Sequence, residues 1–259
     1  MRAFLHTLIA RKISCGDSRP RLSGRAKLDG IETVRGFSRL RRLTAVAALV
    51  AACSFPGRAA DSATITFSLD FPNSEPEHYS ISVAAAGHGT YDCTARISLD
   101  SDDRETYQSE FTFSDRTRSQ IFNLAAQAHY FSGKIDSGNR KLAFTGAKKL
   151  TYTDGQRSSA AEYNFSSNPA VQQLTAIFQS VAATQEFGRR LQYDHRYQKL
   201  ALDDELKKME EEMKRGGLAE VQAVQPILQQ IYDDNSVLNI VRARAERIMA
   251  AANTPTPTR

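Results

Sequence analysis

The segment that decides the fold is Thr64-Ile65-Thr66-Phe67-Ser68-Leu69-Asp70, in which polar and apolar residues alternate without exception. Alternation with a period of two is the pattern of a β-strand that buries one face. It resumes in Tyr79-Ser80-Ile81-Ser82-Val83, after a proline-containing break at 72–76. Gly87-His88-Gly89 then supplies a turn before the strand pattern at 91–97. The sequence therefore predicts an antiparallel sheet in which these two later segments form a β-hairpin.

The sheet pattern continues around one predicted helix. Glu110-Phe111-Thr112-Phe113 is a further short strand, and Ser114 can cap a helix expected over about 115–130. Asp154-Gly155, which tolerates the positive φ of a tight hairpin turn, separates two more alternating segments. Residues 61–167 are therefore predicted to form a small antiparallel sheet that carries one packed helix.

Asn168-Pro169 marks a change from strand to helical spacing. Asparagine caps helices, and proline at the first helical position lacks only an N–H group that has no partner there. The apolar residues then follow a helical stripe, and Gly216-Gly217 is expected to end it and to create an antiparallel helical hairpin. Ser236 is expected to cap a last helix, with Ile240 among the residues that face inward.

The predicted fold class is α+β, a small antiparallel sheet with one packed helix followed by a C-terminal helical hairpin or bundle. The predicted segments are an extension with a signal at 1–60, a sheet domain at 61–167, a helical region at 168–252 and a disordered tail at 253–259.

A signal for export from a bacterial cell is predicted within about 34–59. The basic segment Arg39-Leu40-Arg41-Arg42 precedes the apolar run 43–52, which is too short for the roughly 20 residues of a membrane-spanning helix. A basic segment, a short apolar run and small residues form the layout of a secretory signal. A buried core helix is the alternative, and the adjoining arginines disfavour it. Secretory signals normally stand at the very start of a chain, whereas residues 1–33 precede this one. Our hypothesis is that the assigned translation start lies too far upstream and that Val34 is the alternative start.

Two cleavage sites remain open. Val50-Ala51-Ala52-Cys53 resembles the lipobox of bacterial lipoproteins, in which the cysteine becomes lipidated, so Cys53 is a possible lipidation site. Gly57-Arg58-Ala59 has the small-x-small pattern of a soluble secreted protein, so Ala59 is a possible cleavage site. The first predicts an anchored outer-membrane protein and the second a periplasmic or secreted one. Contact with the membrane is expected only through that lipid anchor.

The charge of the chain argues against nucleic acid as a partner. The formal charge is +5, but residues 1–60 hold 12 of the 34 Lys/Arg and only 3 of the 29 Asp/Glu. The remainder is therefore acidic, and it contains no basic stripe with interleaved aromatic residues.

No specific catalytic, metal or cofactor motif is present. The chain has no G-x-S-x-G, phosphate-binding glycine loop, H-E-x-x-H or paired-cysteine zinc spacing. Cys93 lies in a strand pattern and is expected to be a packed or half-exposed residue rather than a nucleophile. The acids at 203–205 and 210–212 are expected to form a solvated helical face rather than a cation site. We predict no catalytic residue, no metal and no cofactor.

Several segments together resemble a group of exported bacterial proteins without an assigned function. The segments that carry the resemblance are His78–Val83, Gly87–Tyr91, Ala128–Phe131, Thr151–Gly155 and Val241–Ala245. The resemblance covers most of residues 63–250 and implies export and a sheet followed by helices. It carries no active-site residue to this chain.

The sequence thus predicts a non-enzymatic exported protein of the cell envelope or the medium, which acts through interactions with an unknown protein or envelope partner. The alternative is an exported hydrolase or small-ligand-binding protein whose site is assembled only in the fold. A polar pocket that gathers His129 or His195 with carboxylates would favour this alternative.

Overall fold

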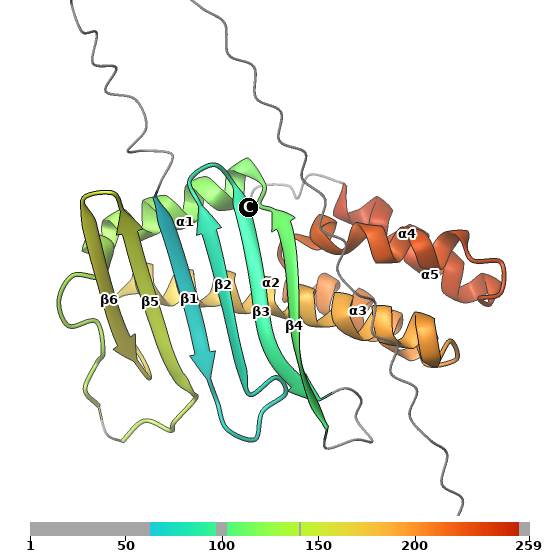
Figure 1. Ribbon diagram of the computed structural model, residues 1–259, viewed down its shortest axis with the longest axis horizontal. Coiled ribbons are helices and arrows are strands. Elements are labelled where there is room, and N and C mark those ends of the chain that lie inside the picture. The colour runs from blue at the N-terminus through green and yellow to red at the C-terminus, as the bar shows by residue number, and fades with distance from the viewer. Residues whose placement is uncertain (1–62, 97–102, 140, 254–259) are drawn as a thin grey trace, which may run out of the picture. The chain divides into compact units, whose positions relative to one another are not determined.

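The computed structural model describes residues 63–96, 103–139 and 141–253 (Figure 1). All of these residues belong to one compact unit. The predicted signal, with Cys53 and Ala59, lies outside the described residues, as does the predicted tail beyond residue 253.

The described part of the chain contains a six-stranded antiparallel sheet in the order β4-β3-β2-β1-β5-β6. Its strands are β1 (Thr64–Asp70), β2 (His78–Ala84), β3 (His88–Arg96), β4 (Arg104–Thr112), β5 (Ala147–Asp154) and β6 (Arg157–Tyr163). The predicted alternation of β1 is confirmed, because Ile65, Phe67 and Leu69 are buried between less buried neighbours. The predicted β2–β3 hairpin and the hairpin around Asp154-Gly155 are also present.

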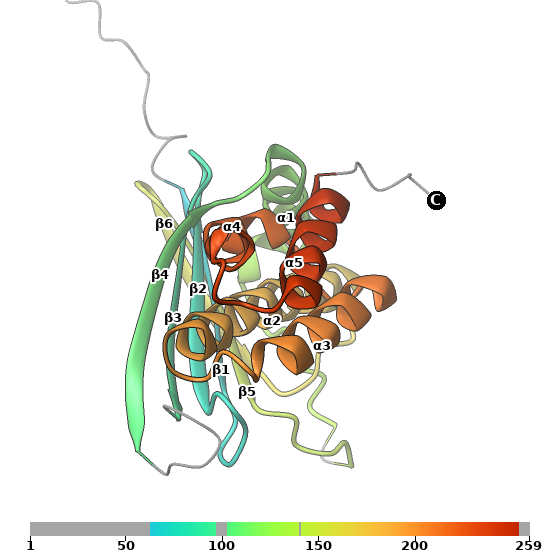
Figure 2. The same ribbon diagram turned by 90° about the vertical axis from the view of Figure 1, so that its right-hand side faces the viewer.

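The helices lie on one side of this sheet, as Figure 2 shows. They are α1 (Asp115–Gln127), the 3-10 turn η2 (His129–Phe131), α2 (Pro169–Tyr197), α3 (Leu202–Arg215), the 3-10 turn η3 (Val221–Val224), α4 (Gln225–Asp233) and α5 (Asn239–Ala252). The predicted N-terminal caps are confirmed at α1 and α2. Ser114 Oγ accepts from the N–H of Thr117, and Asn168 Oδ1 accepts from the N–H of Ala170.

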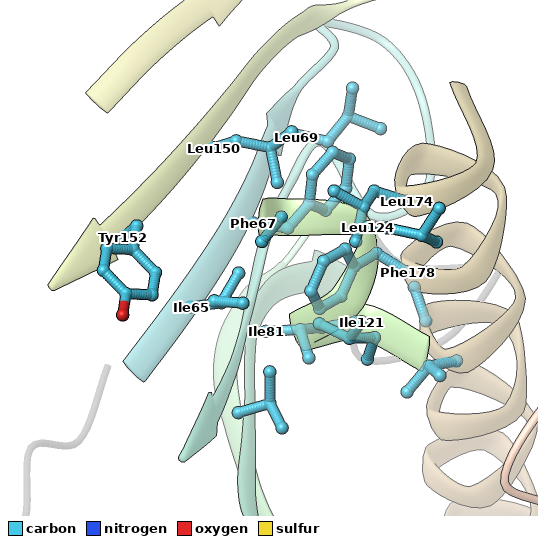
Figure 3. Close-up of a cluster of buried hydrophobic side chains, with 14 of the residues drawn as sticks. Ile65, Phe67, Leu69, Ile81, Ile121, Leu124, Leu150, Tyr152, Leu174 and Phe178 are labelled. Carbon is cyan, nitrogen blue, oxygen red and sulfur yellow. The ribbon is translucent and has the colours of Figure 1, made fainter. Parts of the chain in front are cut away.

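Two helices, rather than the expected one, bury apolar side chains against the sheet. Ile121 of α1 and Phe178 of α2 are both fully buried in the cluster formed by the inner face of the strands (Figure 3). The Phe178 ring stacks on Phe67 of β1, with centroids 5.3 Å apart and planes inclined by 3°. This cluster therefore fixes the first half of α2 against the centre of the sheet.

The second half of α2 belongs to another apolar cluster, formed with α3, η3, α4 and α5. Gly188 permits the close approach of η3 at this point, because a Cβ atom there would lie 2.6 Å from Cγ1 of Val224. One continuous helix thus takes part in two cores. The second half of α2 lies beside the edge strand β4, to which Gln185 and Gln192 are hydrogen-bonded.

Three details of the helical region differ from the sequence prediction. The helical pattern was expected to continue to Gly216-Gly217, but it is interrupted at 198–201. A new helix begins after this break, and the acidic residues in its first turn interact favourably with the helix dipole. Gly216 does end α3, with a φ of 74°. However, the contacts join α3 to α2 and α5, and α4 to α5, so the two helices that flank the glycine pair are not the main packing partners.

The start of α5 was also predicted wrongly. Ser236 donates to Asp234 instead of capping the helix, because the Asp234 carboxylate also accepts from the Ser236 N–H and from Lys199. The helix begins at Asn239, with Leu238 in the N-cap position. Ile240 consequently faces outward and is 59% exposed, rather than buried.

Candidate functional site

A groove of about 500 Å³ lies between the edge strand β4 and the second half of α2. Its lining residues are Glu105, Tyr107, Arg189, Gln192, Tyr193, Arg196 and Tyr197. Its volume is within the roughly 300–1,000 Å³ typical of small-molecule sites. Two contacts fix its walls relative to each other: Ser109 donates to Oε1 of Gln185, and Gln192 donates to the Tyr107 hydroxyl.

The floor of the groove is an almost completely buried arginine. Arg189 is only 6% exposed. Its Nε and Nη2 donate to Oε2 of Glu186 at 3.1 and 2.9 Å, and its Nη1 donates to the carbonyl of Arg96 at 3.0 Å. Oε1 of Glu75 lies 3.8 Å from Nη2. These contacts hold the guanidinium in one orientation, between the end of β3 and α2.

The other oxygen of Glu186 belongs to a buried polar cluster on β3. Glu186 Oε1 accepts from the Tyr91 hydroxyl at 2.6 Å and from Sγ of Cys93 at 3.3 Å. Burial and the negative charge of Glu186 raise the pKa of Cys93 to about 12, and they raise the pKa of Tyr91 well above its ordinary value. Both groups therefore stay protonated near neutral pH. Cys93 is buried as predicted, and its thiol is a hydrogen-bond donor and not a nucleophile.

Aromatic side chains form the walls above this floor. The rings of Tyr193 and Tyr197 lie with centroids 5.1 Å apart, and the guanidinium of Arg196 lies 5.2 Å from the Tyr197 centroid. Tyr107 faces them from β4, and burial raises the pKa of its hydroxyl. The groove thus presents three phenol groups and two guanidinium groups, with Glu105 as the acid among its lining residues. It is suited to hold a flat, polar ligand.

The structure does not gather the histidines that the sequence analysis considered. His78 pairs with Asp70 through a 2.5 Å contact, and His195 pairs with Asp234 at 2.9 Å. Neither His129 nor His195 lines this groove. Among the described residues, no group of three or more His, Cys, Asp or Glu side chains is placed to hold a metal ion.

The acids of α3 only partly form the solvated face that was predicted. Glu205 is buried and forms an ion pair with Arg190 of α2. Glu210 pairs with Lys214, as expected from their spacing, and also with Arg247 of α5. These acids therefore join helices to one another.

No protein-family model matches the chain, and no curated protein matches it. Within the described residues, no helix has the length and apolarity that crossing a lipid bilayer requires.

Glu186 and Arg189 are not among the residues predicted from the sequence, although one signal for them exists. The apolar stripe of α2 passes through Phe178 and Val181, and a helical repeat carries it on toward residues 185–189. Polar residues at positions that a helix turns inward are candidates for a buried network, because buried charges are normally paired. What the spacing does not reveal is the partner strand.

Asp194 of α2 should make the stability of the protein depend on pH. Burial and the negative charge of Glu205 raise the pKa of Asp194 from 3.8 to about 6. Between these two values the folded state keeps a proton that the unfolded state has lost, so stability falls as pH rises through this window. We expect Asp194→Asn to raise the melting temperature at pH 7.5 and to leave it nearly unchanged at pH 3.5.

Thermal unfolding followed by circular dichroism at these two pH values measures this effect. Glu110→Gln, at an exposed position of β4, is the matched control, and it should change neither value appreciably. An Asp194→Asn protein that is equally stabilised at both pH values would show that proton binding by this carboxyl is not the cause.

Proposed function

We propose that the protein is a non-catalytic binding protein that holds a small ligand, with a planar ring and an anionic group, in the groove between β4 and α2. One observation carries the proposal: Arg189 is buried and oriented at the floor of a groove whose walls are three tyrosines. A side chain held in place before a ligand arrives loses little entropy on binding.

The arginines support an anionic group on the ligand. A guanidinium has five N–H donors, and the hydrogen bonds of Arg189 to Glu186 and Arg96 use three of them. Two N–H groups are left over, and Arg189 belongs to the lining of the groove. Arg196 at the rim adds a second positive charge. Planar guanidinium groups suit carboxylate and phosphate groups, which they bind through paired hydrogen bonds.

The tyrosines support a planar ring. Tyr193, Tyr197 and Tyr107 offer ring faces for stacking and hydroxyls for hydrogen bonds. Hydrolysis receives less support from the geometry, because the Cys93 thiol is buried and protonated and no histidine lines the groove. The groove therefore favours ligand binding over the hydrolase alternative.

We further propose that this binding takes place outside the cytoplasm, in the envelope or the medium. The basic and apolar segments within 34–59 support this location, and Cys53 and Ala59 remain the two proposed processing sites.

The test is an NMR titration of the full chain with benzoate, benzamide and benzylammonium, which share a ring and differ in charge. We expect benzoate to bind most tightly and to shift the signals of Tyr107, Tyr193 and Tyr197. Loss of one charge-assisted hydrogen bond in Arg196→Gln should weaken benzoate binding about tenfold.

Arg215→Gln is the matched control, because Arg215 is an exposed arginine of α3 outside the groove lining. It should bind benzoate like the unchanged protein. Equal binding of the three probes, or shifts that avoid the groove, would contradict the proposal.

A further inference from the structure

A second pocket, of about 430 Å³, lies between the ends of β5 and β6 and the first half of α2. Lys148 and Tyr163 are buried residues of its lining, and Gln179 and Ala176 line it from α2. Phe165, 44% exposed, forms part of its rim. This pocket shares no lining residue with the groove described above.

The unusual member of this pocket is Lys148. It occupies the inner face of β5, in register with Leu69 of β1 and Tyr163 of β6, and it is 5% exposed. Its Nζ donates to the carbonyl of Thr145 at 3.0 Å, to the Thr145 hydroxyl at 2.9 Å and to the carbonyl of Asn164 at 3.0 Å. A longer contact of 3.4 Å reaches the carbonyl of Gly146, so four neutral oxygens surround the ammonium group.

These oxygens accept hydrogen bonds from Lys148 but do not balance its charge. No carboxylate among the described residues forms an ion pair with Lys148, and burial lowers its pKa. Among the residues that the structure describes, Arg189 is the other deeply buried cation, and it differs because the Glu186 carboxylate lies directly against its guanidinium. Buried charges in proteins are normally paired, since an unpaired one is costly.

We propose that this pocket binds a small organic acid, whose carboxylate or phosphate group supplies the counter-charge of Lys148. The pocket is much larger than the roughly 30 Å³ that one water molecule occupies in the liquid, so it has room for more than a bare ion. The apolar part of the ligand lies against Phe165 and Ala176, and the amide of Gln179 is a further donor for the oxyanion.

Calorimetric titration of the full chain with hexanoate, hexyl phosphate and hexanamide tests the proposal. These probes share an apolar chain and differ in the head group. We expect at least one of the two anions to bind about tenfold more tightly than the neutral amide. The ranking of hexanoate against hexyl phosphate then identifies which oxyanion the site takes.

Lys148→Met should weaken binding of the preferred anion about tenfold. Lys149→Met is the matched control, because Lys149 is the next residue of β5 but is exposed and pairs with Glu162. It should leave the affinity unchanged. If Lys148→Met does not fold, Gln179→Leu replaces it, with a smaller loss of affinity expected.

The proposal is overturned if hexanamide binds as tightly as both anions, or if neither anion binds. It is also overturned if the Lys148 and Lys149 variants bind alike. Arg196→Gln should leave the binding of these probes unchanged, which separates this pocket from the groove.

Discussion

Replacement of Arg189 by methionine should lower the free energy of unfolding by about 3–5 kcal/mol, because it leaves a buried carboxylate without its positive partner. Glu186 is almost fully buried, and its Oε2 loses both of its hydrogen bonds from Arg189. Nη1 of Arg190, at 3.9 Å, lies beyond hydrogen-bonding distance of the same oxygen. Urea denaturation at pH 7 measures the change, with the slope of the transition as a check on two-state behaviour.

The double variant Glu186→Gln/Arg189→Met distinguishes loss of charge pairing from loss of packing. The neutral amide keeps an acceptor for the Tyr91 hydroxyl and places no charge in the interior. We therefore expect the double variant to be more stable than Arg189→Met alone, as is common when a whole buried pair is replaced. Arg215→Met, which breaks only exposed ion pairs, should cost less than about 0.5 kcal/mol. An Arg189→Met protein no less stable than Arg215→Met would refute the assigned role of the pair.

The strands that could be predicted from sequence are those with one buried face. β1 shows perfect alternation, since its inner residues contact the helices and its outer residues do not. For β4 only the end at Glu110–Phe113 was predicted, although the strand begins at Arg104. Before Phe111 the inner face of this edge strand carries only half-buried or exposed residues, among them the polar Ser109, so apolar residues do not alternate there.

The candidate site could not be predicted because its parts are distant in the sequence. Tyr91 and Cys93 belong to β3, whereas Glu186 and Arg189 belong to α2, more than 90 positions later. Local periodicity indicates that each segment buries a face, but not which segment lies opposite. The proposed pocket at Lys148 raises the same difficulty, because a lysine in a strand is ordinarily exposed.

Replacement of Phe178 by alanine should lower the free energy of unfolding by about 3–5 kcal/mol. Phe178 is completely buried, and its ring stacks parallel to that of Phe67, so the substitution removes both apolar contacts and an aromatic pair (Figure 3). Phe144→Ala is the control, because Phe144 is 57% exposed and leaves little cavity when truncated. Urea denaturation of both variants at pH 7 gives the comparison. A Phe178→Ala protein as stable as Phe144→Ala would contradict the assigned role of this stack.

The shape of the Phe178→Ala transition also tests how the two apolar cores are coupled. Phe178 lies in the core beneath the sheet, while Phe187 and Leu191 of the same helix lie in the core formed with α3, α4 and α5. Because α2 is continuous between them, loss of the first core removes the support of the second. We therefore expect a single transition, with helical and aromatic circular dichroism signals lost together. Two separated transitions would instead show that residues 168–252 unfold as a domain of their own.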